Sequence, residues 1–167
     1  EMWSNDEPSF QGNYVTVGDI YFRPQPVQKP HIPIWIGGDS MVALKRTARA
    51  GDAWYPVGLS PKDRYNTVAR YAMGAETLRR LTEEAKRDPA DVELSFWAVW
   101  YREDDPVNVD DGSRHIFLGS SEQVAEDVAK MKELGVSSIL FNFMRPTLTE
   151  SLESMERFAA EVMPAGR

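Results

Sequence analysis

The chain has 167 residues, 42% of them hydrophobic and 27% charged, a composition typical of one globular domain with a sizeable core. Acidic residues outnumber basic ones 26 to 19, and the net charge of −7 disfavours nucleic acid and acidic membrane surfaces as partners. There is no cysteine for a disulfide, no apolar run of the length that a membrane span needs and no signal-peptide pattern at the start, so we expect a cytoplasmic protein.

Strands and helices alternate along the chain after a polar, proline-rich opening segment, residues 1–32. Residues 33–167 then hold four predicted strand–helix units. The predicted strands are 34–36, 52–57, 92–100 and 137–143, and the helices that follow them are 40–50, 60–85, 120–135 and 147–162. Such alternation predicts an α/β protein with right-handed crossovers in a parallel sheet. Two architectures fit, an open doubly wound sheet or a piece of a (β/α)8 barrel, and periodicity does not separate them.

Helix starts are marked by polar caps. Ser60, followed by Pro61, is expected to cap the second helix, while Ser120 and Thr147 begin capping-box patterns for the third and fourth. The last helix is expected to bury a stripe formed by Leu152, Met155, Phe158, Ala159 and Val162.

The first strand runs directly into Gly37, Gly38, Asp39 and Ser40. Glycines at the end of a strand let a ligand approach bare backbone, and the free N–H groups of the next helix turn attract an anion such as phosphate. The alternative is a tight turn in which Asp39 or Ser40 is an ordinary N-cap, and the negative charge of Asp39 counts against an anion.

Several segments together resemble the luciferase-like monooxygenases, which are flavin- or deazaflavin-dependent oxidoreductases. They are residues 10–12, the proline-rich stretch 24–38 that ends in Gly-Gly, residues 43–48, the Gly-Asp-Ala-Trp of 51–54 and the later run 118–136. The resemblance implies an eight-stranded (β/α)8 barrel, of which this chain holds four strands that correspond to strands five to eight. Residues 1–167 would then be a single C-terminal half-barrel. We expect it to be completed by an absent N-terminal half or by a second copy in a homodimer.

The same resemblance implies a cofactor, either FMN or the deazaflavin coenzyme F420, whose phosphate lies at Gly37, Gly38, Asp39 and Ser40. Trp54 either borders the cofactor ring or packs in the core. Arg145, just after the last strand, either binds an anionic group of a small-molecule substrate or lies on the surface. The cofactor carries the chemistry in such enzymes, and no catalytic residue is assigned.

Other candidates have a structural interpretation beside the functional one. His31 and His115 are expected to be structural, and these two distant histidines without clustered carboxylates predict no metal site. The run 103–105 of acidic residues either reaches substrate or forms a charged surface loop. Trp97 and Trp100 are three apart on a strand, so one is expected to face the barrel interior and the other the helices.

The resulting hypothesis is half of a luciferase-like oxidoreductase, with the isolated 167-residue chain inactive and only weakly able to bind cofactor. Two alternatives remain. One is a non-catalytic, homo-oligomeric half-barrel with a structural or binding role. The other is an unrelated open α/β sheet that binds a nucleotide phosphate at Gly37 and Gly38.

Overall fold

The computed structural model describes residues 1–60, 62, 64–103 and 105–166. The chain divides into two units, Glu1–Ile34 and Trp35–Arg167. The first unit contains a small antiparallel pair, β1 (Phe10–Gln11) and β2 (Thr16–Val17). The second unit contains the rest of the regular structure.

The second unit is built on a four-stranded parallel sheet. Its strands are β3 (Trp35–Gly37), β4 (Ala53–Tyr55), β5 (Glu93–Ala98) and β8 (Val136–Phe141), in the spatial order β3-β4-β5-β8. The order in space is therefore the order along the chain. Among the described residues, β3 and β8 each pair with a strand on one side only. The predicted α/β class with a parallel sheet is confirmed, although β4 and β5 are shorter than expected.

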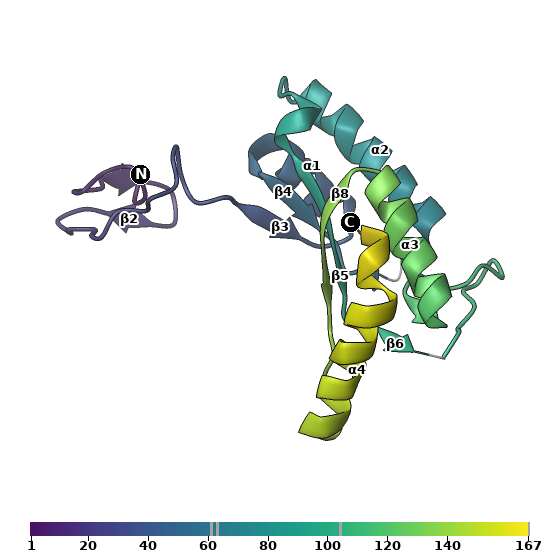
Figure 1. The fold of residues 1–167 in the computed structure, drawn as a ribbon. Coiled ribbons are helices and arrows are strands. Elements are labelled where there is room, and N and C mark those ends of the chain that lie inside the picture. Colours follow the sequence, from purple (N-terminus) through teal and green to yellow (C-terminus); the bar gives the residue numbers. More distant parts are fainter. Residues whose placement is uncertain (61, 63, 104, 167) are drawn as a thin grey trace. The chain divides into compact units, whose positions relative to one another are not determined.

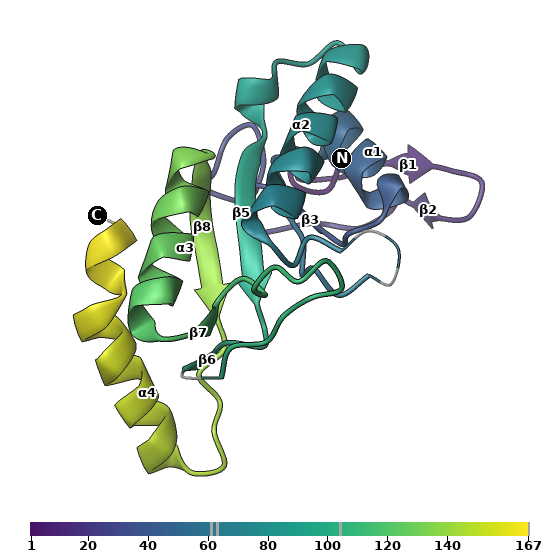
Figure 2. The ribbon, with the colours of Figure 1, turned by 90° about the vertical axis from the view of Figure 1, so that its right-hand side faces the viewer.

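Four helices cover one face of this sheet (Figures 1 and 2). They are α1 (Met41–Ala50), α2 (Val68–Glu84), α3 (Ser121–Glu133) and α4 (Leu148–Glu161), with short 3-10 turns η1 (Pro89–Asp91) and η2 (Met163–Gly166). A doubly wound sheet has helices on both faces, so this arrangement differs from the open-sheet alternative. Between β5 and β8 the chain also forms the short parallel pair β6 (Arg102–Glu103) and β7 (Leu118–Gly119).

Three of the four helix N-caps considered from the sequence are present in the structure, and one is not. Ser40 caps α1, and both capping boxes, at Ser120 and Thr147, are present. The prediction that Ser60 caps the second helix is wrong, because α2 begins later, with Thr67 as its N-cap. Pro61 lies outside the described residues. The amide of Ser60 donates to the Asp39 carboxylate at 2.9 Å, and its hydroxyl accepts from the Lys62 amide at 3.3 Å, in the loop that precedes α2.

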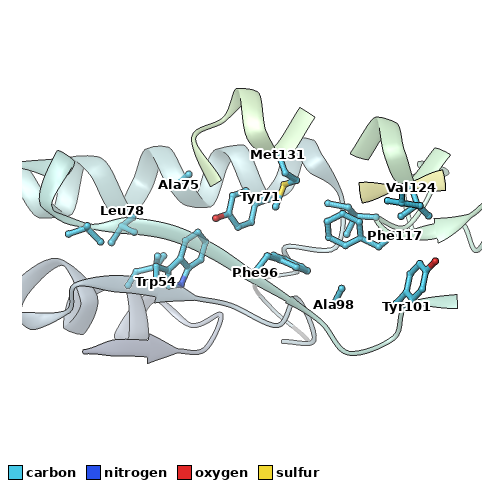
Figure 3. Close-up of a cluster of buried hydrophobic side chains, with 14 of the residues drawn as sticks. Trp54, Tyr71, Ala75, Leu78, Phe96, Ala98, Tyr101, Phe117, Val124 and Met131 are labelled. Atoms are coloured by element: carbon cyan, nitrogen blue, oxygen red, sulfur yellow. The ribbon is translucent and has the colours of Figure 1, made fainter. Parts of the chain in front are cut away.

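The core lies between the sheet and the helices and is rich in aromatic rings (Figure 3). Phe96 of β5 lies at its centre, with edge-on ring contacts to Tyr71 at 5.6 Å and to Phe117 at 5.6 Å. Edge-to-face pairs of this kind add to the free energy gained from burying the rings.

At the far edge, α4 buries Phe158 and Val162, but Leu152 and Met155 are 49% and 48% exposed, so the predicted stripe is only partly buried. No described strand lies beyond β8 to cover them. None of the helices that the structure describes is long and apolar enough to cross a membrane.

Candidate functional site

The turn from Gly37 to Ser40 lies at the carboxyl end of β3, beside the end of β4. Gly37 pairs with Tyr55, and the amide of Gly38 donates to the Tyr55 carbonyl at 3.3 Å. Gly38 has φ +116°, a conformation that favours glycine, and a Cβ there would approach Ala43 to 3.2 Å. Gly37 and Ser40 are exposed. The turn therefore presents bare backbone at the edge where the ligands of parallel α/β proteins bind.

Ser40 combines two roles at this turn. Its Oγ accepts a hydrogen bond from the Ala43 amide at 3.3 Å, which makes it the N-cap of α1. A hydroxyl that accepts one bond can still donate its own proton. The start of α1 thus offers an anion unpaired backbone N–H groups and one hydroxyl donor.

The Asp39 side chain binds the backbone of the loop that follows β4. Its carboxylate is 7% exposed and accepts four backbone N–H groups, from Val57 and Gly58 on one oxygen and from Leu59 and Ser60 on the other, at 2.8–2.9 Å. These bonds hold the loop that follows β4 against the turn. The charge of Asp39 is neutralised locally by backbone dipoles, and the side chain binds the chain itself.

Trp54 supports the turn from the core. Its indole is fully buried, and its Nε1–H donates to the Gly38 carbonyl at 3.1 Å. The ring stacks on Tyr71 at 5.3 Å and meets Tyr65 edge-on at 5.0 Å. Of the two roles considered for Trp54, the geometry of this chain corresponds to packing, because no part of the ring reaches the surface.

The sheet face opposite the helices carries an aromatic strip, Trp35, Tyr55 and Trp97, which sequence reasoning missed as a group. Trp35 is 42% and Trp97 is 40% exposed. Tyr55 stacks on Trp97 with centroids 6.0 Å apart and meets Trp35 edge-on at 5.6 Å. Gly37 lies on this same face, two residues after Trp35. Partial burial raises the pKa of Tyr55, so its hydroxyl stays protonated at neutral pH.

The two tryptophans of the third predicted strand separate as expected. Trp97 belongs to the aromatic strip, whereas Trp100, just beyond β5, packs edge-on against Phe96 and donates its Nε1–H to the Ile116 carbonyl at 3.1 Å. The prediction that both lie on one strand is wrong, because β5 ends at Ala98 and Trp100 lies in the turn that follows it. The stacking with Tyr55 depends on the sheet register, which the sequence does not show.

Arg145 is held by the chain. Its guanidinium donates to the Tyr101 carbonyl at 3.3 Å and to the Ser154 hydroxyl at 3.1 Å, and it lies over the Tyr101 ring. Glu103 is also built into this region: it accepts from the Tyr101 hydroxyl at 2.9 Å and pairs with Arg157 at 2.9 Å. Its side chain is 10% exposed, so the prediction of a charged surface loop is wrong for this residue.

The other two carboxylates of that run differ. Asp105 is exposed and lies 3.7 Å from Arg102, as in a surface loop. Asp104 lies outside the described residues.

The histidines pack locally. His31 lies in the first unit, near the ring of Trp3. His115 packs edge-on against Trp100 at 4.7 Å, and burial lowers its pKa, so the ring is neutral at pH 7. Among the residues that the structure describes, no group of three or more His, Asp or Glu side chains is placed to hold a metal ion.

The chain is an α/β protein with a sequential parallel sheet, helices on one face and a glycine turn at the carboxyl end of the first strand, features that are typical of the strand–helix units of (β/α)8-barrel enzymes. The sequence model of the luciferase-like monooxygenases matches residues 1–117. The chain belongs to this family.

Curated relatives agree with this assignment. The FMNH2-dependent dimethylsulfone monooxygenase of Pseudomonas putida is 26% identical over 204 aligned residues, which cover 99% of this chain and 55% of that protein. The chain therefore spans about half the length of the curated relatives it matches.

Solved structures share the fold at low sequence identity. The coenzyme F420-dependent tetrahydromethanopterin reductase of Methanopyrus kandleri has a TM-score of 0.74 at 11% identity, covering 99% of this chain and 60% of that one. An F420-dependent secondary alcohol dehydrogenase, solved with an F420–acetone adduct, has a TM-score of 0.65 at 18% identity, covering 99% and 58%.

Proposed function

We propose that this chain is the C-terminal half of a luciferase-like (β/α)8 oxidoreductase, with β3, β4, β5 and β8 as barrel strands five to eight. Three observations support this: the strand order is sequential, the helices lie on one face, and the chain matches about half of its relatives. Strands with one free edge call for another segment to complete the sheet. We infer that this segment is an N-terminal half-barrel or a second copy.

The proposed cofactor is FMN or coenzyme F420, with its phosphate at the turn from Gly37 to Ser40. One observation carries this proposal: the exposed turn and the aromatic strip share one face and one end of the sheet. The N–H groups at the start of α1 and the Ser40 hydroxyl would bind the phosphate, while Asp39 and Trp54 hold the turn in position.

The aromatic strip would form an apolar wall of the pocket and exclude water from it. When bound, reduced FMN supplies the reaction with oxygen, whereas F420 supplies hydride transfer. The residues of this chain bind and orient the cofactor. A small-molecule substrate would then meet the cofactor against Trp35, Tyr55 and Trp97.

A titration of the full-length gene product with FMN and with F420, followed by cofactor fluorescence, tests this proposal. Gly37→Val places a side chain on the exposed strand end, where ordinary extended backbone tolerates it and a Cβ meets only the Tyr55 carbonyl, at 3.5 Å. We expect affinity to fall by about tenfold or more, equivalent to about 1.4 kcal/mol. Gly18→Val, where a Cβ meets nothing within 4 Å, is the matched control.

Equal cofactor affinity in wild type and Gly37→Val would refute the phosphate assignment. The half-barrel assignment has its own test, light scattering of the isolated 167-residue chain. We expect association through the free edges of β3 and β8, together with weak cofactor binding and no turnover. A stable monomer that turns over would contradict this part of the proposal.

A further inference from the structure

A cavity of about 480 Å³ lies beside the start of α1, next to the proposed phosphate turn. Met41, which directly follows Ser40, lines it together with residues of α2 and of the loop that precedes α2. Its charged lining consists of Lys62, Arg64, Arg70 and Asp110. The cavity thus carries three cations and one carboxylate in a chain whose net charge is −7.

The three cations differ in how many hydrogen bonds and ion pairs they already make within the chain. Arg70 is held by Asp110, by Asp111 at 2.8 Å and by Asn66 at 2.9 Å. Arg64 is 45% exposed and approaches Asp110 only to 3.8 Å. Within the part of the chain that the structure describes, the Lys62 ammonium has no ion-pair partner. Lys62 and Arg64 therefore keep donors for an incoming anion.

The loop that leads to these cations is bonded to the turn at Leu59 and Ser60. Asp39 holds the amides of Leu59 and Ser60, and Lys62 follows two residues later. On the other side of the cavity, Met41 is the first residue of α1. The cavity and the turn are thus adjacent at Ser40 and Met41, which are consecutive in the chain.

We propose that this cavity binds a second anionic group of the cofactor, the carboxylates of an extension beyond the phosphate. The inference rests on the proposed function, because the first phosphate is assigned there. FMN ends at its phosphate and leaves the cavity empty, whereas the deazaflavin coenzyme carries a carboxylate-bearing tail on its phosphate. The cavity thus favours F420 over FMN, a choice that the sequence left open.

The double variant Lys62→Ala/Arg64→Ala tests the inference in the full-length protein. We expect its affinity for F420 to fall by about tenfold through the loss of two charge-assisted contacts, while its affinity for FMN stays within about twofold. Arg79→Ala/Lys130→Ala, which removes two exposed helix cations elsewhere, is the matched control for net charge. The charge-conserving Lys62→Arg/Arg64→Lys should retain most of the F420 affinity.

A second measurement is independent of the flavin site. Citrate, a tricarboxylate, is titrated into the isotope-labelled protein, and the amide resonances of Met41, Arg70 and Thr77 are followed by NMR. We expect saturable shifts that the double variant loses and the control variant keeps. Absence of these shifts, or an equal loss of FMN and F420 affinity in the double variant, overturns the inference. Failure of wild type to bind either cofactor refutes the proposed function instead, and the citrate titration still decides whether the cavity binds carboxylates.

Discussion

Asp39→Asn is the sharpest test of how the turn is built. The asparagine carbonyl can keep the two bonds from Val57 and Gly58, but its NH2 group then faces the amides of Leu59 and Ser60, which are also donors. Two hydrogen bonds to a charged acceptor are lost, at about 1.5–3 kcal/mol each. Water can reach the partly buried amides of Leu59 and Ser60, so we expect the unfolding free energy to fall by about 2–4 kcal/mol.

Urea unfolding followed by tryptophan fluorescence measures this change. Asp91→Asn, at an exposed position of η1, is the control and should change the unfolding free energy by less than about 0.5 kcal/mol. A loss in Asp39→Asn as small as the control's would refute the view that this carboxylate holds the loop. Cofactor affinity should fall in the same variant, because the loop and the turn move together.

Three further predictions concern the core. Burial raises the pKa of Tyr71 and Tyr101, so the folded chain keeps protons that unfolded tyrosines lose near pH 10; the unfolding free energy should fall as pH rises above about 10, and Tyr71→Phe should flatten that fall in urea titrations. Burial lowers the pKa of His115, so the unfolded chain takes up a proton first as pH falls below about 6.5; stability should decrease there, and a His115→Gln variant that shows the same pH slope would contradict this. Gly74→Ala places a Cβ 2.6 Å from the Tyr65 ring and 2.8 Å from the Trp54 ring, so it should lower stability by about 1–3 kcal/mol despite the better helix propensity of alanine, and an unchanged or raised melting temperature would disprove this clash.

The fold was predictable where local chemistry decides it. Strand–helix alternation gave the α/β class, and the caps at Ser40, Ser120 and Thr147 were each visible as a local pattern. The start of α2 was not, because Ser60 satisfies the local rule for a cap as well as Thr67 does. In the structure the Thr67 hydroxyl accepts the Arg70 amide, while the Ser60 amide donates to Asp39, 21 residues earlier in the chain.

The candidate site, too, was predictable from the sequence only where neighbouring residues determine it. The glycine turn was visible in the sequence, but the four partners of the Asp39 carboxylate lie 18–21 residues away, beyond the reach of a motif. The aromatic strip depends on sheet register, since its three members come from three different strands. The stripe of α4 has the right period, yet Leu152 and Met155 remain exposed because burial needs a neighbour as well as a pattern.

The sequential order of β3, β4, β5 and β8 has a consequence for how the molecule is made. Each strand–helix unit packs mainly on the unit before it or after it, so most native contacts join stretches that are close along the polypeptide. Each parallel pairing nonetheless joins residues that are 18 to 43 positions apart, from Trp35 with Ala53 to Ser95 with Ser138, so we expect the sheet to form more slowly than a structure built from local contacts. As the chain leaves the ribosome, each unit can dock on the unit made just before it, and α4 docks last.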